Sequence, residues 1–153
     1  MKLVLLTHSR ETQKASNTGQ LVHKHVANTQ IIIWQRTHPD PSLLEIIKAG
    51  NTALLYPEGN ETHSSFMTPD DFENFILIDS TWQEARKIYN RSPYLQQLPC
   101  IQLAVKQSSS YTLRRNQLEG GLCTAECAIE LLRNKQLTEV ADKLEAAFVS
   151  FVN

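Results

Sequence analysis

The segment 75-FILIDSTWQEARKIYN-90 indicates which class of fold the chain adopts. Its first four residues, Phe75 to Ile78, are apolar and β-prone, which predicts a strand buried on both faces. Asp79 follows, and the pattern from Ser80 to about Asn90 predicts a helix. A buried strand that leads directly into a helix is typical of α/β proteins, which bind ligands beyond the carboxyl ends of their parallel strands.

Apolar runs and amphipathic segments alternate on both sides of this segment. Further strands are expected at Leu3–Leu6, Ile31–Trp34, Thr52–Tyr56 and Ile101–Val105, and further helices after Gly19, over Leu43–Lys48, over Leu122–Leu132 and over Leu137–Phe151. We therefore expect an α/β fold with a mostly parallel sheet and helices on both faces. Pro57-Glu58-Gly59 and Asp79-Ser80-Thr81 follow two of the strands, and these strand ends are where we expect the chemistry.

Composition limits the class of protein. A chain of 153 residues with 41% hydrophobic residues is long enough for one domain with a core of ordinary size. A net charge of −1 gives no global sign of nucleic-acid binding, so such a role needs local clusters of charge. No apolar run approaches the roughly 20 residues of a membrane span. Cys100, Cys123 and Cys127 form no disulfide framework, which favours a reducing cytoplasm.

The junction after the strand has two interpretations. Ser80 and Gln83 fit a capping box, in which Ser80 is the N-cap residue and Gln83 hydrogen-bonds back to it. Asp79 then lies just outside the helix, near its positive pole, where an anion is favoured. Trp82 in the first turn is either part of the core or the wall of a ligand site. The pattern alone leaves both residues open.

Several motifs of the sequence resemble those of one known family. Asp79-Ser80-Thr81-Trp82 has the Asp-x-Thr-Trp form of the DTW-domain proteins, which resemble the tRNA-uridine aminocarboxypropyltransferases and are related to the knotted SPOUT methyltransferases. The other motifs are His8-Ser9-Arg10-Glu11 with Lys14 and Asn17-Thr18-Gly19, then Leu54-Leu55-Tyr56-Pro57, Tyr111-Thr112-Leu113-Arg114 and Cys123-Thr124-Ala125-Glu126. They occur in the family's order and extend from about residue 3 to about residue 134, so the resemblance is specific.

This resemblance implies a SPOUT-like fold with a C-terminal knot and a reaction with S-adenosylmethionine. The implied reaction transfers the 3-amino-3-carboxypropyl group to N3 of a uridine in tRNA and releases methylthioadenosine. Two alternatives stay open at this point: a non-catalytic RNA-binding module of the same fold, and a SPOUT-like RNA methyltransferase.

The resemblance also implies roles for individual residues. Asp79 is the expected base that takes the N3 proton, or alternatively binds the amino group of S-adenosylmethionine and orients its arm. The residues expected to bind S-adenosylmethionine are Leu55, Tyr56, Pro57, Ser80, Thr81, Trp82, Tyr111, Arg114, Thr124 and Glu126. The residues expected to bind RNA are Arg10, Lys14, Arg86, Arg91 and Arg115, although Glu84 with Lys87 is a possible ion pair at i, i+3 spacing.

Many members of the family carry a cysteine cluster of zinc-binding type ahead of the His-x-x-Glu motif. The present sequence begins at that motif, so we expect a single DTW domain over residues 1–153 without that segment. Cys123 and Cys127 lack the further ligands of a structural zinc site, so no metal is expected. The expected partner is tRNA, and the chain is either a monomer or a homodimer.

Overall fold

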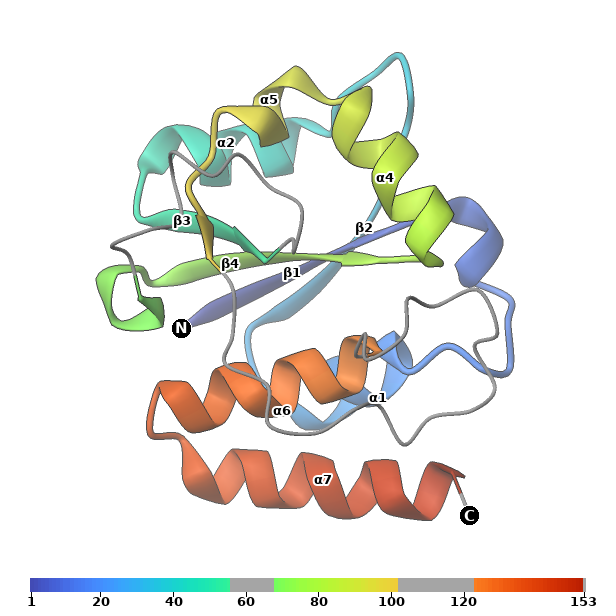
Figure 1. The fold of residues 1–153 in the computed structure, drawn as a ribbon, viewed down its shortest axis with the longest axis vertical. Helices are drawn as coiled ribbons and strands as arrows, with labels where there is room; N and C mark the ends of the chain where they lie inside the picture. The colour runs from blue at the N-terminus through green and yellow to red at the C-terminus, as the bar shows by residue number, and fades with distance from the viewer. Residues whose placement is uncertain (56–67, 102–122, 153) are drawn as a thin grey trace.

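The computed structural model describes residues 1–55, 68–101 and 123–152, apart from the side chain of Trp82, and these residues form an α/β fold (Figure 1). The strands are β1 (Lys2–Thr7), β2 (Thr29–Ile33), β3 (Thr52–Leu55), β4 (Asn74–Asp79) and β5 (Cys100–Ile101). The helices are α1 (Gly19–His25), α2 (Pro41–Ala49), α4 (Trp82–Asn90), α5 (Pro93–Gln96), α6 (Thr124–Asn134) and α7 (Thr138–Val152), with short 3-10 turns η1 (Ser9–Glu11) and η2 (Pro69–Asp71).

The five strands form one sheet in the order β2-β1-β4-β3-β5, and all of the described pairings are parallel. The expected α/β class and parallel sheet are therefore confirmed. In the register of β1 with β4, Thr7 lies opposite Asp79. The two central strands thus end level with each other, and the residues that follow them leave the sheet at one edge.

Side chains of successive strand residues point to opposite faces, which divides the core into two clusters. Leu3, Leu5 and Leu77 pack with α1, α6 and α7, whereas Val4 and Leu6 pack with α2, α4 and α5. Figure 1 shows these two helical layers on either side of the sheet. The sheet is covered on both faces, as near-continuous apolar strands require.

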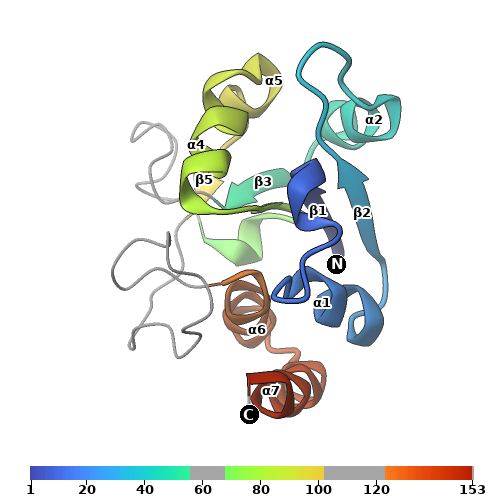
Figure 2. The same cartoon turned by 90° about the vertical axis from the view of Figure 1, so that its right-hand side faces the viewer.

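The connections that follow β1 and β4 cross opposite faces of the sheet. From β1 the chain passes through α1, on one face, to the neighbouring strand β2. From β4 it passes through α4 and α5, on the other face, to β5. Figure 2 shows η1 and the start of α4 at this edge, with α1 and α6 below them. Such a topological switch point is where open α/β sheets bind their ligands.

Several element boundaries differ from the expected ones. Strand β4 continues through Asp79 because that residue still pairs with Thr7. Strand β2 ends at Ile33, although the Trp34 N–H still donates to the Thr7 carbonyl at 2.9 Å. Helix α6 begins at Thr124, since Cys123 before it has extended backbone angles. Residues 102–105 of the expected fifth strand lie outside the described residues, as does the segment 102–122 before α6 where the knot is expected.

Among the described helices, none has both the length and the apolar character that crossing a membrane requires.

Candidate functional site at the carboxyl edge of β1 and β4

The alternation of side chains continues to the strand ends and divides the edge into two sides. Thr7 and Asp79 extend the face that carries Leu5 and Leu77, which is covered by α1 and α6. The next residue, His8, turns to the other face, where Glu84 of α4 lies within 3.6 Å of its ring. The edge therefore presents a carboxylate on one side and an imidazole on the other.

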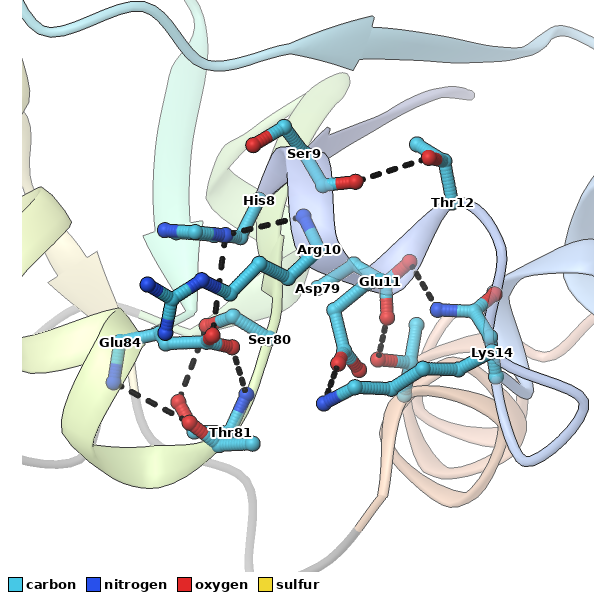
Figure 3. A network of polar contacts seen from close by, with 12 residues as sticks. His8, Ser9, Arg10, Glu11, Thr12, Lys14, Asp79, Ser80, Thr81 and Glu84 are labelled. Atoms are coloured by element: carbon cyan, nitrogen blue, oxygen red, sulfur yellow. Dashed lines mark hydrogen bonds and ion pairs between the residues drawn. The ribbon is translucent and has the colours of Figure 1, made fainter.

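The carboxylate of Asp79 is buried, with 2% of the residue exposed. Its Oδ2 accepts a hydrogen bond from Asn17 Nδ2 at 2.9 Å, and Thr7 Oγ1 lies 3.3 Å from the same oxygen. Its Oδ1 accepts a hydrogen bond from Thr124 Oγ1 at 2.8 Å (Figure 3). Because an ionised carboxylate is costly to bury unless it is hydrogen-bonded, these donors are what allow Asp79 to occupy this position.

The motif Asn17-Thr18-Gly19 forms the cradle around this carboxylate. Asn17 donates to Asp79 through its amide nitrogen and accepts the Gln20 N–H at 3.2 Å through its oxygen. Thr18 accepts the backbone N–H of Ala125, in the first turn of α6, at 3.0 Å. A Cβ added at Gly19 would lie 2.4 Å from Asp79 Oδ2, so only glycine leaves room for the carboxylate. Each residue of the motif thus has a physical task.

The expected capping box at Ser80 and Gln83 is wrong by one residue. Thr81 is the N-cap residue of α4: its Oγ1 accepts the Glu84 N–H at 3.2 Å, and Glu84 Oε1 accepts the Thr81 N–H at 3.0 Å. Ser80 instead donates to the Thr81 carbonyl at 3.0 Å. The extra residue of β4 moves the helix start along by one, and Thr81 with Glu84 satisfies the same Ser/Thr-x-x-Glu pattern.

His8 and Glu84 form the second part of the site. The Arg10 N–H donates to His8 Nδ1 at 3.1 Å, so in this arrangement the ring proton is on Nε2. Glu84 Oε2 lies 3.6 Å from the same Nδ1, which becomes a hydrogen bond only when Nδ1 carries a proton. The expected Glu84–Lys87 pair is wrong, because Glu84 directs its oxygens to Thr81 and His8.

The Glu84 carboxyl is ionised more readily than an ordinary one. Burial alone would raise the pKa of this carboxyl. The net effect lowers the pKa below its ordinary value of 4.5, because the carboxylate accepts a hydrogen bond from the Thr81 backbone N–H, faces the charge of His8 when protonated, contacts the Thr81 side chain and lies near Lys14. Glu84 therefore presents a negative charge to His8 at neutral pH.

The structure describes only some of the remaining expected site residues. Thr124 meets Asp79 directly, whereas Glu126 caps α6 by accepting the Cys123 N–H at 3.2 Å, and Leu55 ends β3 half-buried. The positions that lie outside the described residues are Tyr56, Pro57, Tyr111, Arg114, Arg115 and the side chain of Trp82.

Positive charge near this edge is partly neutralised. Lys14 Nζ pairs with the buried carboxylate of Glu11 at 2.5 Å, so its charge is not wholly available to a partner. Arg10, Arg86 and Arg91 are exposed. Within the described ranges, no three His, Cys, Asp or Glu side chains lie close enough together to hold a metal ion.

Sequence reasoning assigned no role to Thr7, Asn17 or Thr18, which hold the carboxylate and the start of α6. The signal that marks them is the motif Asn17-Thr18-Gly19, which lies between the first expected strand and the first expected helix. Glu84 was treated only as a surface partner of Lys87, and its contact with His8 has no local signal because the two residues are far apart in the sequence.

The molecule is an α/β domain with a parallel sheet and a buried, hydrogen-bonded carboxylate at a topological switch point, where open sheets of this class bind ligands. Comparison with known proteins identifies its family. The DTW domain profile matches residues 1–153, so the chain belongs to the DTW domain family, as expected from its motifs. No solved structure gives a significant match.

Three curated relatives share the same name, tRNA-uridine aminocarboxypropyltransferase 2. The Drosophila melanogaster protein is 28% identical over 144 residues, which cover 86% of this chain and 55% of that protein. The Macaca fascicularis protein is 28% identical over 119 residues, covering 73% and 40%, and the Mus musculus protein is 29% identical over 92 residues, covering 58% and 31%. The chain thus aligns with about half or less of each relative's length.

Proposed function

We propose that this chain transfers the 3-amino-3-carboxypropyl group of S-adenosylmethionine to N3 of a uridine in tRNA and releases methylthioadenosine. Membership of the DTW domain family supports the proposal, and so do the names of the three relatives. The observation that carries it is the position of Asp79-Ser80-Thr81, which lies at the switch point between β1 and β4. A binding site in such a sheet is expected at this point.

The side chains described at this edge fit the charge of S-adenosylmethionine. Its sulfonium and ammonium groups are positive, and Asp79 and Glu126 supply carboxylates at the ends of β4 and the start of α6. When bound, S-adenosylmethionine supplies a γ-carbon activated by the sulfonium. In the proposal, the charge of Asp79 orients the amino-acid arm. Ser80, Thr81 and Thr124 bind it, together with the other expected residues: Leu55, Tyr56, Pro57, Trp82, Tyr111, Arg114 and Glu126.

Of the two roles that the sequence leaves open for Asp79, we propose the orienting one. Its carboxylate is 2% exposed and accepts hydrogen bonds from Asn17 and Thr124. A base must reach the proton that it removes, whereas the negative charge of a buried carboxylate attracts and orients a cationic group without touching it. Selecting between the methyl group and the γ-carbon of the same sulfonium is a matter of such orientation.

The partner in the proposal is tRNA, held through the exposed arginines. Arg10 follows β1, Arg86 lies on α4 and Arg91 is the C-cap residue of that helix. Contacts of this kind with phosphates supply affinity that does not depend on sequence and that decreases with salt. Lys14, paired with Glu11, and Arg115 complete the proposed set.

The test is transfer of label from S-adenosylmethionine to an unmodified tRNA transcript. With wild-type protein, label on the amino-acid arm is expected in RNA and label on the methyl group is not. Methyl label in RNA would identify a methyltransferase, and tight RNA binding without any transfer would identify a binding module; either result overturns the proposal.

Asp79→Asn is the matched variant for the role of the carboxylate. It keeps the shape of the side chain but removes the charge, and the amide nitrogen cannot accept one of the two bonds that Asn17 and Thr124 donate. We expect S-adenosylmethionine to bind at least tenfold more weakly, and transfer to fall with it. Full binding and full transfer by a folded Asp79→Asn variant would overturn the orienting role.

A further inference from the structure

We propose that His8 accepts the proton from uracil N3 and that Glu84 holds the imidazole in the tautomer that can do so. This inference rests on the proposed function, because it concerns the same reaction. Two tasks thus fall to two residues. The buried carboxylate of Asp79 orients S-adenosylmethionine, and His8, on the other side of the edge, acts on the uridine.

The order of the strands places His8 between the end of β2 and the residues proposed to bind S-adenosylmethionine. The residues proposed to bind S-adenosylmethionine follow β4 and β3, whereas His8 follows β1, and Trp34 follows β2 on the far side. The backbone N–H of His8 donates to the backbone carbonyl of Asp79 at 3.2 Å, so the two residues are linked through the backbone. A uridine that approaches over β1 therefore meets the imidazole next to the end of β4.

The His8 ring is positioned and accessible at the same time. It stacks on Trp34 with the ring centroids 6.3 Å apart and 27° between the planes, and Trp34 is held by a 2.9 Å hydrogen bond from Nε1 to Ser92 Oγ. The His8 side chain is 20% exposed, and within the described part of the chain its Nε2 has no hydrogen-bond partner. Nε2 is therefore the ring nitrogen that is left for a substrate.

Glu84 is arranged to control which nitrogen of His8 carries the proton. Its Oε1 is held by the Thr81 N–H, which directs Oε2 to His8 Nδ1 at 3.6 Å. When Nδ1 exchanges the hydrogen bond that it accepts from the Arg10 backbone N–H for one that it donates to Glu84, Nε2 is left unprotonated. The charged groups described around this pair are Glu84 from α4 and, from the segment after β1, Arg10 and Lys14, of which Lys14 acts on the Glu84 carboxylate (Figure 3). Histidine is the side chain best suited to proton exchange near neutral pH.

Transfer of the aminocarboxypropyl group requires the loss of one proton from uracil N3. Imidazole Nε2 takes the proton of uracil N3, and the electron pair of N3 forms a bond to the γ-carbon of the aminocarboxypropyl arm. The bond from that carbon to sulfur breaks, and its electrons leave with methylthioadenosine. The imidazolium, stabilised by Glu84, then loses its proton to water. No further reactant is needed.

A purely structural role for His8 also exists, since its Nδ1 caps η1 by accepting the Arg10 N–H. His8→Asn is the variant that separates the two roles, because asparagine is an equally good cap but is not a base. We expect His8→Asn to fold and to bind RNA as the wild type does, with the transfer rate at saturating substrates lowered about 10²-fold or more. A rate within threefold of the wild type overturns the inference.

A second substrate tests proton removal specifically. In tRNA transcribed with 5-fluorouridine, the N3 proton is more acidic, so the reaction depends less on a base. The defect of His8→Asn should shrink at least tenfold with this RNA, whereas a defect due to misfolding would be equal with both RNAs. An equal defect overturns the inference but leaves the proposed function intact, and a wild-type protein that transfers no arm label overturns both.

A third readout needs no S-adenosylmethionine. Nitrogen NMR of the histidine rings, with His8 assigned by the signal lost in His8→Asn, reports which ring nitrogen carries the proton. In the free protein we expect the proton on Nε2, and with tRNA bound we expect it on Nδ1. In Glu84→Gln the change should not occur. A ring that keeps its Nε2 proton in the complex of wild-type protein with tRNA contradicts the proposed base.

Discussion

Gly19→Ala tests whether the carboxylate cradle is as tightly packed as the structure indicates. A Cβ at this position would lie 2.4 Å from Asp79 Oδ2, 3.0 Å from Asp79 Cγ and 3.1 Å from Asn17 Oδ1. The carboxylate or the start of α1 must therefore move by about 1 Å to restore an ordinary contact of 3.4 Å. Such a movement lengthens the hydrogen bonds that Asp79 accepts from Asn17 and Thr124.

The expected cost follows from three terms. Overpacking a filled site costs about 1–3 kcal/mol. Weakening a hydrogen bond to a charged group costs up to about 1.5–3 kcal/mol when the bond is lost completely. Alanine returns about 1 kcal/mol because it is a better helix former than glycine. We expect a net loss of about 1–3 kcal/mol in the free energy of unfolding, which for a chain of this size lowers Tm by roughly 3–10 °C.

Chemical denaturation of four proteins measures this loss and assigns it to the named contact. These are the wild type, Gly19→Ala, Asp79→Ala and the double variant, with Gln20→Ala as a control at the exposed neighbouring position. Because Asp79→Ala removes the two nearest atoms that the new Cβ would meet, Gly19→Ala should cost less in that background, and the coupling should exceed about 1 kcal/mol. Equal costs in both backgrounds, or a cost no larger than that of Gln20→Ala, would refute the packing argument.

Two further predictions concern titrating groups. The lowered pKa of Glu84 stabilises the fold above pH 4.5, and this contribution is lost as the pH falls through its folded-state value. The stability difference between the wild type and Glu84→Gln should therefore shrink below pH 4.5 in denaturation experiments, and a difference that is constant with pH would be inconsistent with this. Burial raises the pKa of Cys123 and of Cys127 to about 12. Both thiols should resist iodoacetamide at pH 8 in the native protein and react in the unfolded protein. A cysteine introduced at the exposed position Ser150 is the reactive control. Rapid labelling of Cys123 or Cys127 in the native protein would contradict the raised pKa values.

The sheet was predictable because its strands are buried on both faces. Runs such as Leu3–Leu6 and Phe75–Ile78 are apolar without interruption, which distinguishes them from the amphipathic helices between them. The boundaries were less predictable, since Ser80 and Thr81 are both good cap residues. The pairing of Asp79 with Thr7 decides between them, and it depends on a strand at the other end of the sequence.

The site was predictable only in part, for the same reason. Asp79 and Thr124 were expected from family motifs, and the structure brings them together at 2.8 Å. No periodicity indicates that Asn17 donates to that carboxylate, or that Glu84 approaches His8, because these contacts join segments that are distant in sequence. Local patterns describe elements, whereas a site at a switch point is made where unrelated connections meet.

The alternation of side chains gives this edge its division of tasks. Thr7 and Asp79 point into the layer of α1 and α6, where hydrogen bonds from several segments can immobilise a charge that water does not reach. His8, the first residue after β1, points to the other layer. There α4 supplies the carboxylate of Glu84, and the imidazole ring stays partly exposed. A carboxylate in the first environment is rigid, which suits it to orienting a substrate, and an imidazole in the second can exchange a proton. Moving either strand by one residue would exchange the two faces, so the level ends of β1 and β4 are a requirement of the proposed chemistry.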